Sequence, residues 1–238
     1  MCSHSPSKTN YYEFSAIKRR TYSKDEISEA SLLRLRCSTN AQRIADDCYP
    51  KDWGGMVPKE WVKYLNESLG NDVAGWRVKA NSRLKKRIHF GVLFGTFAVL
   101  ISPELRRKLE ESGLKGLSFI PVRYDHPEKA ARQLFQFGHQ VKMPKCLTPR
   151  LNQCGEDWRE NDLEGGIWDD AGYVPEELRF HRQEVEAMGE FDIATTREVI
   201  GANSSFYHSE VVVSQRFRKV MDDFGVKTAE YVPIRLVE

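Results

Sequence analysis

One internal repeat constrains the fold of this chain more than any other feature of its sequence. Residues 99–123 and 211–235 align at an offset of 112 without a gap. Similarity at a fixed offset indicates that one supersecondary unit is used twice. The identical positions are Val99 and Val211, Ser102 and Ser214, Arg106 and Arg218, Gly113 and Gly225, Lys115 and Lys227, Pro121 and Pro233, and Arg123 and Arg235. The repeat contains no catalytic constellation, which favours a binding protein over an enzyme.

Each copy of the repeat predicts a strand, a helix and a second strand. An apolar run comes first, as in a buried strand. Ser102 and Ser214 follow where an N-cap belongs, because a hydroxyl can accept a bond from the first helical N–H groups. Apolar residues then recur at spacings of three and four, and Gly113 and Gly225 supply the left-handed residue that ends a helix. The closing strand contains a proline, which lacks a ladder donor, so this strand is expected at an edge, a bulge or a strand start. Spacing leaves the relative direction of the two strands open.

Similarity between the two parts of the chain extends upstream of the repeat. Residues 55–61 resemble residues 172–178 at an offset of 117, and Cys37 and Cys154 share that offset. We therefore expect an α+β fold in which two related strand–helix–strand units form a pseudo-symmetric arrangement. The predicted parts are a flexible tail at 1–9, a first half at 10–125 and a second half at 126–238, with one shared core left open.

Local patterns also predict where the helices lie. Glycine turns followed by a proline and an amphipathic pattern are typical helix starts. Residues 127–136 are expected to form a short helix that begins at Pro127 and links the halves. The other predicted helices are 26–36, 58–68, 103–112, 175–188 and 214–224.

Composition and net charge are ordinary for a soluble globular protein. Of the 238 residues, 40% are hydrophobic and 29% are charged, and the formal net charge is +2. This net charge provides no strong field toward nucleic acid or membrane. The basic segment 77–89 is expected to line an exposed helix or turn. It has no interleaved aromatic residues, which argues against nucleic-acid binding.

The N-terminus and the cysteines indicate the cytoplasm. Residues 1–10 lack the apolar core of a signal peptide. The longest apolar stretch, 90–101, spans twelve residues, whereas a transmembrane helix needs about 20. The chain has five cysteines and no export signal, so reduced thiols are expected. We predict a cytoplasmic protein that does not bind membranes.

The most unusual local charge lies at residues 155–173. This segment contains seven acidic residues, one arginine and two interleaved tryptophans. One interpretation is a solvated loop whose tryptophans enter the core. The other is a recognition surface with aromatic anchors and an acidic rim, matched to a basic partner. The candidate partner-binding residues are Glu156, Asp157, Trp158, Glu160, Asp162, Trp168, Asp169 and Asp170.

Motifs that carry chemistry are absent from the sequence. It has no P-loop, no dinucleotide-binding glycine motif, no nucleophile elbow and no H-E-x-x-H. The histidines lie apart from one another, and no C-x-x-C knuckle is present for zinc. We therefore predict no cofactor, no metal and no catalytic residue. An enzyme that uses carboxylates of 155–173 and His181 as acid and base stays open as an alternative.

One pattern in the repeat resembles a known family. A strand that ends in V-V-x-S, a helix with R-F-R-K-V-M, a glycine and a strand with a central proline are similar to the bacterial double-CXXCG motif immunity proteins, which accompany toxins. In that family a CXXCG knuckle precedes each half. Here the matching stretches 34–38 and 151–155 keep only Cys37 and Cys154, and only Gly155 of the glycines. The missing cysteines remove the expectation of a bound metal.

The resemblance implies a function without turnover. Such a protein binds a cognate toxin in the cytoplasm and neutralises it by stoichiometric occlusion. Many toxins act on nucleic acid and present basic clefts, which the acidic segment 155–173 would complement. An adaptor or structural binding module is the remaining alternative.

Overall fold

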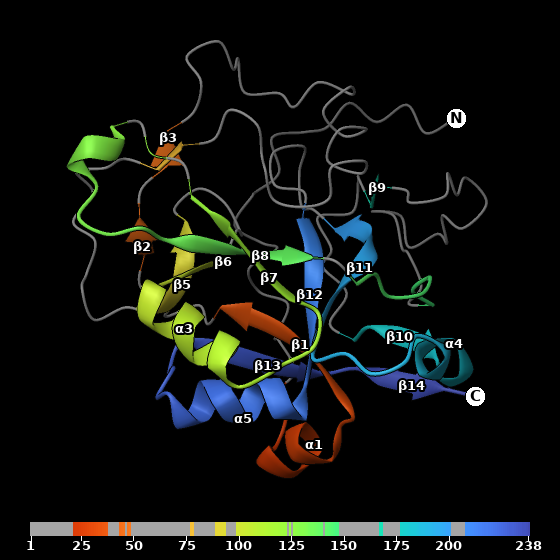
Figure 1. Ribbon diagram of the computed structural model, residues 1–238. Helices are drawn as coiled ribbons and strands as arrows, with labels where there is room; N and C mark the ends of the chain where they lie inside the picture. The colour runs from red at the N-terminus through yellow and green to blue at the C-terminus, as the bar shows by residue number, and fades with distance from the viewer. Residues whose placement is uncertain are drawn as a thin grey trace, which may run out of the picture.

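The computed structural model describes a mixed α/β protein with short helices and small sheets (Figure 1). The described residues are 21–37, 43–45, 47–48, 77–78, 89–93, 99–122, 124, 126–139, 141–147, 167–168, 177–200 and 208–238. The helices are α1 (Lys24–Glu29), α3 (Pro103–Glu111), α4 (Arg182–Ala187) and α5 (Gln215–Asp223), with a 3₁₀ turn η2 (Pro127–Lys129). None of these helices is long and apolar enough to cross a membrane.

The described strands form two five-stranded and two two-stranded sheets. The β6 sheet has the order β2-β5-β6-β8-β7, with β2 (Arg43–Ala45), β5 (Phe90–Leu93), β6 (Val99–Ile101), β7 (Leu117–Pro121) and β8 (Phe135–His139). The β12 sheet has the order β13-β1-β12-β11-β9, with β1 (Leu32–Cys37), β9 (Ile167–Trp168), β11 (Ile193–Ile200), β12 (His208–Ser214) and β13 (Ala229–Pro233). The two small sheets pair β3 (Asp47–Cys48) with β4 (Arg77–Val78), and β10 (Arg179–His181) with β14 (Arg235–Val237).

Both segments of the sequence repeat contain the predicted elements, as β6–α3–β7 and as β12–α5–β13. In the β6 sheet, β8 lies between β6 and β7 and is antiparallel to both. In the β12 sheet, β1 lies between β12 and β13 and is likewise antiparallel to both. The outer strands of each trio therefore run parallel to each other, which settles the direction that spacing left open.

The two predicted N-caps are confirmed. The Ser102 hydroxyl accepts a bond from the Leu105 N–H, and the Ser214 hydroxyl accepts one from the Phe217 N–H, both at 3.1 Å. Each bond satisfies one of the N–H groups that have no partner within the helix. Gly113 follows α3 with φ of 63°, so the left-handed ending is present as well.

The prolines of the repeat lie in edge strands, as predicted. β7 and β13 are the outermost strands of their sheets. The Val122 N–H donates to the Leu134 carbonyl, and the Ile234 N–H donates to the Leu32 carbonyl, both across the inner ladder. Backbone groups alternate in direction along an antiparallel strand. The preceding residue in each case is a proline whose missing N–H would have pointed away from the sheet.

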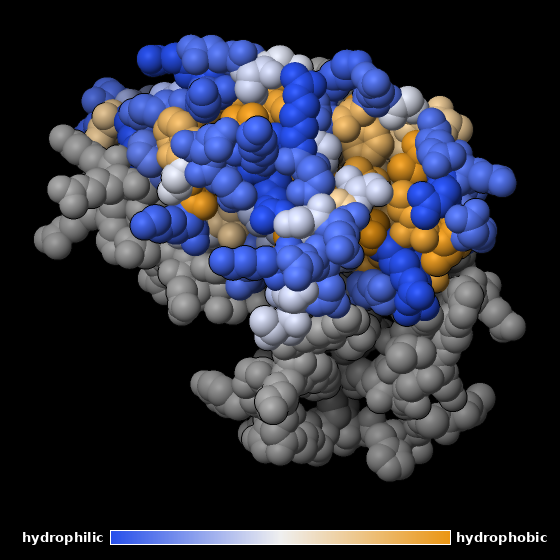
Figure 2. Space-filling model, turned by 90° about the horizontal axis from the view of Figure 1, so that it is seen from below, coloured by the Kyte–Doolittle hydropathy of each residue, from blue (hydrophilic) through white to orange (hydrophobic). Residues whose placement is uncertain are grey.

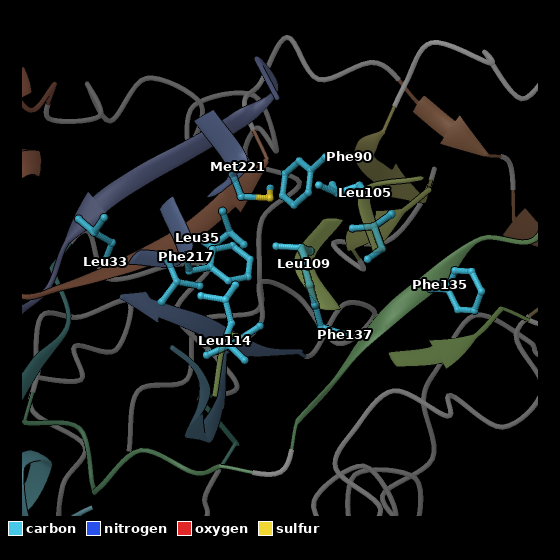
Figure 3. Packing of buried hydrophobic residues seen from close by; sticks show 13 residues of the cluster. Leu33, Leu35, Phe90, Leu105, Leu109, Leu114, Phe135, Phe137, Phe217 and Met221 are labelled. Atoms are coloured by element: carbon cyan, nitrogen blue, oxygen red, sulfur yellow. The ribbon is translucent and has the colours of Figure 1, made fainter. Parts of the chain in front are cut away.

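One hydrophobic core joins the two five-stranded sheets through α3 and α5. Figure 3 shows Leu35 of β1, Leu109 of α3 and Phe217 of α5 converging in it. Burial of each such side chain stabilises the fold by about 1.5–3 kcal/mol. A second cluster lies on the opposite face of the β12 sheet, where Leu32 and Val212 pack with residues of β10 and α4. The β12 sheet is thus covered on both faces.

Three helix predictions were wrong in part. Residues 26–36 split into α1 and the strand β1, because Leu33 and Leu35 alternate with Arg34 and enter the core. Residues 127–136 form only η2 before β8 begins, because pairing with two strands overrides local helix propensity. Within 175–188, Arg179–His181 pairs with β14 and the helix is limited to α4. The helix predicted at 58–68 lies outside the described residues.

A comparison of two glycines tests the packing between the halves. Gly116 has φ of 83°, and an added Cβ would lie 2.7 Å from the Ile193 carbonyl oxygen. Gly225 has φ of 82°, and a Cβ added there would have no atom within 4 Å. We expect Gly225→Ala to cost about 1–2 kcal/mol from backbone strain alone, and Gly116→Ala to cost roughly 3 kcal/mol or more. Urea unfolding of both variants measures the difference, and equal losses would contradict this packing.

Candidate functional site

A buried carboxylate joins the two halves of the chain. Asp192 is 5% exposed and precedes β11. Its carboxylate accepts bonds from the Lys115 N–H at 2.8 Å and from the Ser214 hydroxyl at 2.6 Å. The Asp192 and Ile193 N–H groups in turn donate to the Lys115 carbonyl. Asp192 therefore fixes the loop after α3 against the start of α5.

An arginine completes this junction. Arg216 Nη1 lies 3.3 Å from the Asp192 carboxylate, and Arg216 Nη2 donates to the carbonyls of Ser112 and Gly113 at 2.9 and 3.0 Å. The start of α5 thus lies beside the end of α3, as Figure 1 shows. A cation is favourable at a helix C-terminus, where carbonyls have no partner within the helix. The junction polar groups are engaged in holding the halves together.

The other capping serine also contacts a titratable side chain. The Ser102 hydroxyl lies 2.9 Å from His89 Nδ1, and Glu104 lies 3.8 Å from the same nitrogen. A catalytic triad needs the two ring nitrogens on opposite partners, whereas here Nδ1 faces both. Ser102 is fully buried. Hydrogen bonds from the Glu104 N–H and from Ser102 lower the pKa of Glu104, so the group acts as an anionic helix cap.

The second buried ionic group lies on the β12 sheet. Arg34 of β1 and Glu210 of β12 have side chains that are 1% and 4% exposed. Arg34 Nε donates to Glu210 Oε2 at 2.6 Å, and Arg34 Nη2 donates to Glu210 Oε1. Such a bidentate pair compensates charges that would otherwise be very costly to bury. The Glu210 N–H also donates to the Thr196 hydroxyl at 2.9 Å.

One exposed surface combines apolar side chains with acids. We call it the α4–β14 surface. Its residues, all partly or fully exposed, are Glu184, Glu186, Ala187, Met188, Phe191, Leu236 and Val237. Figure 2 shows apolar side chains gathered on the right-hand side of its view, where Figure 1 places α4 and β14.

The charges of this surface are only partly neutralised. Arg182 Nε donates to the Glu238 carboxylate at 3.0 Å and ties α4 to the end of β14. Glu184 and Glu186 form no ion pair with the described part of the chain. An apolar patch with an acidic rim is suited to contact with a basic protein surface.

The partner-binding residues predicted from the acidic segment are mostly outside the described residues. Glu156, Asp157, Trp158, Glu160, Asp162, Asp169 and Asp170 belong to this group. Only the backbone at Ile167–Trp168 is described, as β9, which pairs in parallel with Val199 and Ile200 of β11. His181, named in the enzyme alternative, is exposed at the start of α4 and forms no side-chain capping bond.

Among the described residues, no group of three or more histidines, cysteines or carboxylates is arranged to hold a metal ion. Cys146 is buried in the second hydrophobic cluster, which also contains Met143. The backbone of Cys37 ends β1, and Cys154 lies outside the described residues.

Sequence reasoning missed both buried ionic groups. The alternation of Leu33, Arg34 and Leu35 carried a strand signal, and this signal was read as part of a helix. Asp192 carried no local signal, because its partners Lys115 and Ser214 lie 77 and 22 residues away. The α4–β14 surface also needs the tertiary structure, since it joins an internal helix to the last strand.

Comparisons with known proteins add no assignment: no family model matches this chain, and no curated protein and no solved structure matches it.

Removal of the Asp192 carboxylate is expected to destabilise the junction. Asp192→Ala leaves the partly buried Lys115 N–H and Ser214 hydroxyl without their acceptor, at a cost of about 2–4 kcal/mol. The matched control is Glu190→Ala, which removes an exposed carboxylate paired with Lys115 and should leave stability unchanged. Urea unfolding measures both. An Asp192→Ala variant as stable as the control would show that the junction does not depend on this carboxylate.

The Arg34–Glu210 pair should matter most when it is broken from one side. Arg34→Met leaves Glu210 buried without the guanidinium, and we expect a loss of about 3–5 kcal/mol. The double variant Arg34→Met/Glu210→Leu removes both charges and should recover most of that loss, because apolar replacements of buried pairs are often neutral. Chemical denaturation of the single and double variants checks this. Equal losses in the two would contradict the argument.

Proposed function

We propose that this chain is an immunity protein, which binds a cognate bacterial toxin in the cytoplasm and neutralises it by stoichiometric occlusion. The resemblance of 205–238 and 97–123 to immunity proteins supports this function. The observation that carries it in the folded chain is the contrast between two sets of groups. The ionisable groups Asp192, Arg34 and Glu210 are buried and engaged in holding the fold. The apolar α4–β14 surface is partly exposed, and the acids beside it have no ion pair within the described chain.

The scaffold for this function consists, in our proposal, of two copies of one strand–helix–strand unit in a pseudo-symmetric arrangement. The support is that equivalent side chains make equivalent contacts. Arg106 lies 5.6 Å from the ring centroid of Phe119, and Arg218 lies 5.7 Å from that of Tyr231. Each arginine also pairs with an acid four residues later, at 2.8 and 3.4 Å. Duplication leaves two similar halves that share one core and differ at their surfaces.

The proposed interface consists of the acidic segment 155–173 and the α4–β14 surface. The two are close in sequence, because only a few residues separate the segment from β10 and α4. Aromatic anchors from Trp158 and Trp168, with acids around them, suit a basic cleft in a toxin. Steering by opposite charge would speed encounter between the two proteins. Occlusion then needs only a tight complex, with no chemical step by this chain.

The test of the function is growth rescue. A toxin-like gene encoded beside this one is expressed in a test bacterium with and without this protein, and the two proteins are purified together. We expect rescue and a one-to-one complex. Rescue without a complex would favour an enzyme that reverses the damage. A complex without rescue, or neither result, would contradict neutralisation and favour an adaptor with another partner.

Charge reversal locates the interface. Glu156→Lys/Asp157→Lys/Asp169→Lys/Asp170→Lys and, separately, Glu184→Lys/Glu186→Lys should each weaken toxin binding by about tenfold or more, because attraction becomes repulsion. The matched control is Glu111→Lys/Asp223→Lys, which makes the same charge change as the second variant at the exposed last residues of α3 and α5. Calorimetric titration with toxin measures the affinities. Equal weakening by Glu184→Lys/Glu186→Lys and the control would remove the α4–β14 surface from the interface.

A further inference from the structure

Two strands of this chain occupy the same place in two different sheets. With the two repeat segments aligned at their offset of 112, Ile101 corresponds to Val213. Ile101 pairs with Phe135 of β8, and Val213 pairs with Leu33 of β1. The register also matches on the other side of β8 and β1, where they pair with β7 and β13. Phe119 pairs with Phe137 of β8, and Tyr231, its counterpart, pairs with Leu35 of β1.

The order of the elements along the chain shows to which half each of these strands belongs. β1 is the first strand of the first half, and β5, β6, α3 and β7 come later in the same half. β8 is the first strand of the second half, and β11, β12, α5 and β13 come later in that half. Yet β1 lies in the β12 sheet and β8 lies in the β6 sheet. We infer that the two halves exchange their first strands, and that the buried Arg34–Glu210 pair decides which strand enters which sheet.

The segment before β1 supports the exchange, because it also packs on the other half. α1 contacts β13. Gln215 at the start of α5 donates through Nε2 to the carbonyls of Ile27 and Ala30. Both elements of this arm, α1 and β1, therefore contact the second half. η2 stands in the corresponding place before β8.

Core-facing residues alone give a weak choice between the two strands. β1 contributes Leu33 and Leu35 to the shared core, and β8 contributes Phe135 and Phe137 at the same register positions. Both pairs are large and apolar, and cores tolerate exchanges among such residues better than burial of an unpaired charge. Within the two strands themselves, selection must therefore come mainly from residues on the opposite face.

On that face the two strands differ in charge. β1 carries Arg34 opposite Val212, and β8 carries Gln136 opposite Leu100, which is the counterpart of Val212. The β12 sheet supplies the carboxylate of Glu210 for Arg34. If β8 took the place of β1, Glu210 would face an amide and lose its guanidinium. Loss of the bidentate pair from this buried carboxylate would disfavour that arrangement by about a hundredfold or more.

A steric contact adds a smaller preference in the other sheet. Gly138 of β8 pairs with Ser118 of β7, and a Cβ at Gly138 would lie 2.2 Å from the Ser118 hydroxyl oxygen. The residue of β1 at this register position is Arg36, which pairs with Glu230 in the β12 sheet. Entry of β1 into the β6 sheet would require the serine side chain to move. The Arg34–Glu210 pair in the β12 sheet and the close contact at Gly138 in the β6 sheet thus favour the same exchange.

Cysteine pairs in the full chain report the position of β1. Arg36→Cys/Glu230→Cys places two thiols on neighbouring strands if β1 lies in the β12 sheet. Arg36→Cys/Ser118→Cys does so only if β1 lies in the β6 sheet. After mild oxidation, peptide mapping should find the 36–230 disulfide within single chains and at least tenfold less of the 36–118 disulfide, since cross-strand neighbours have the spacing of a disulfide. A 36–118 disulfide as the main product, or a 36–230 disulfide only between chains, would overturn the exchange.

Moving the charge tests its role in selection. Arg34→Gln/Gln136→Arg transfers the guanidinium from β1 to β8. We expect the yield of the 36–230 disulfide to fall in the first cysteine variant and the yield of the 36–118 disulfide to rise in the second, so that the ratio of the two yields changes by roughly a hundredfold. A folded variant with an unchanged ratio would overturn the selecting role of the pair.

A second variant keeps this test decisive if the first one does not fold. Arg34→Met/Glu210→Leu removes both charges and leaves apolar side chains in their place. With selection by charge removed, the 36–118 disulfide should rise by at least tenfold relative to the parent. The matched control is Arg107→Gln, which removes an exposed arginine of α3 and should leave the ratio unchanged. A ratio equal to that of the control in the double variant would overturn the proposed selection.

Discussion

The insertion of β1 between β12 and β13 is the constraint on which the rest of the structure depends. This strand pairs with a neighbour on each side, and its side chains enter two different hydrophobic clusters. Leu33 and Leu35 face the core shared with α3 and α5, and Leu32 faces the cluster under α4. Removal of β1 would leave β12 and β13 without their common ladder and would open both cores at once.

The polar groups of the molecule divide into those that hold the fold and those that remain available. Asp192, Arg216 and the two capping serines join helix ends, loops and halves through bonds to backbone groups. Asp192 and Ser102 are buried, and buried polar groups are costly to leave unpaired, so these two are committed to holding the fold. The α4–β14 surface differs, because its two acids are exposed and most of its apolar side chains are partly exposed. A protein built this way is suited to binding, and the proposed immunity function uses that surface together with the acidic segment 155–173.

Sequence reasoning succeeded where a signal was local. Ser102 and Ser214 cap their helices as predicted, and Pro121 and Pro233 lie in edge strands, because capping and the loss of a ladder donor depend only on the residue and its close neighbours. Sequence reasoning failed where pairing with a strand far away in the sequence decided the secondary structure. Leu33 and its neighbours were read as helix, although their pairing with β12 and β13 makes them a strand, and 127–136 lost most of its predicted helix to β8 for the same reason.

By itself, the sequence determined the two strand–helix–strand segments, their caps and their edge strands, because these follow from spacing and residue type within about 25 residues. It did not determine which strand completes which sheet. Arg34 and Glu210 are 176 residues apart, and Lys115 and Asp192 are 77 residues apart, so only the folded chain brings them together. The tertiary structure also decided where the exposed apolar surface lies, because that depends on which faces of α4 and β14 the second cluster leaves uncovered.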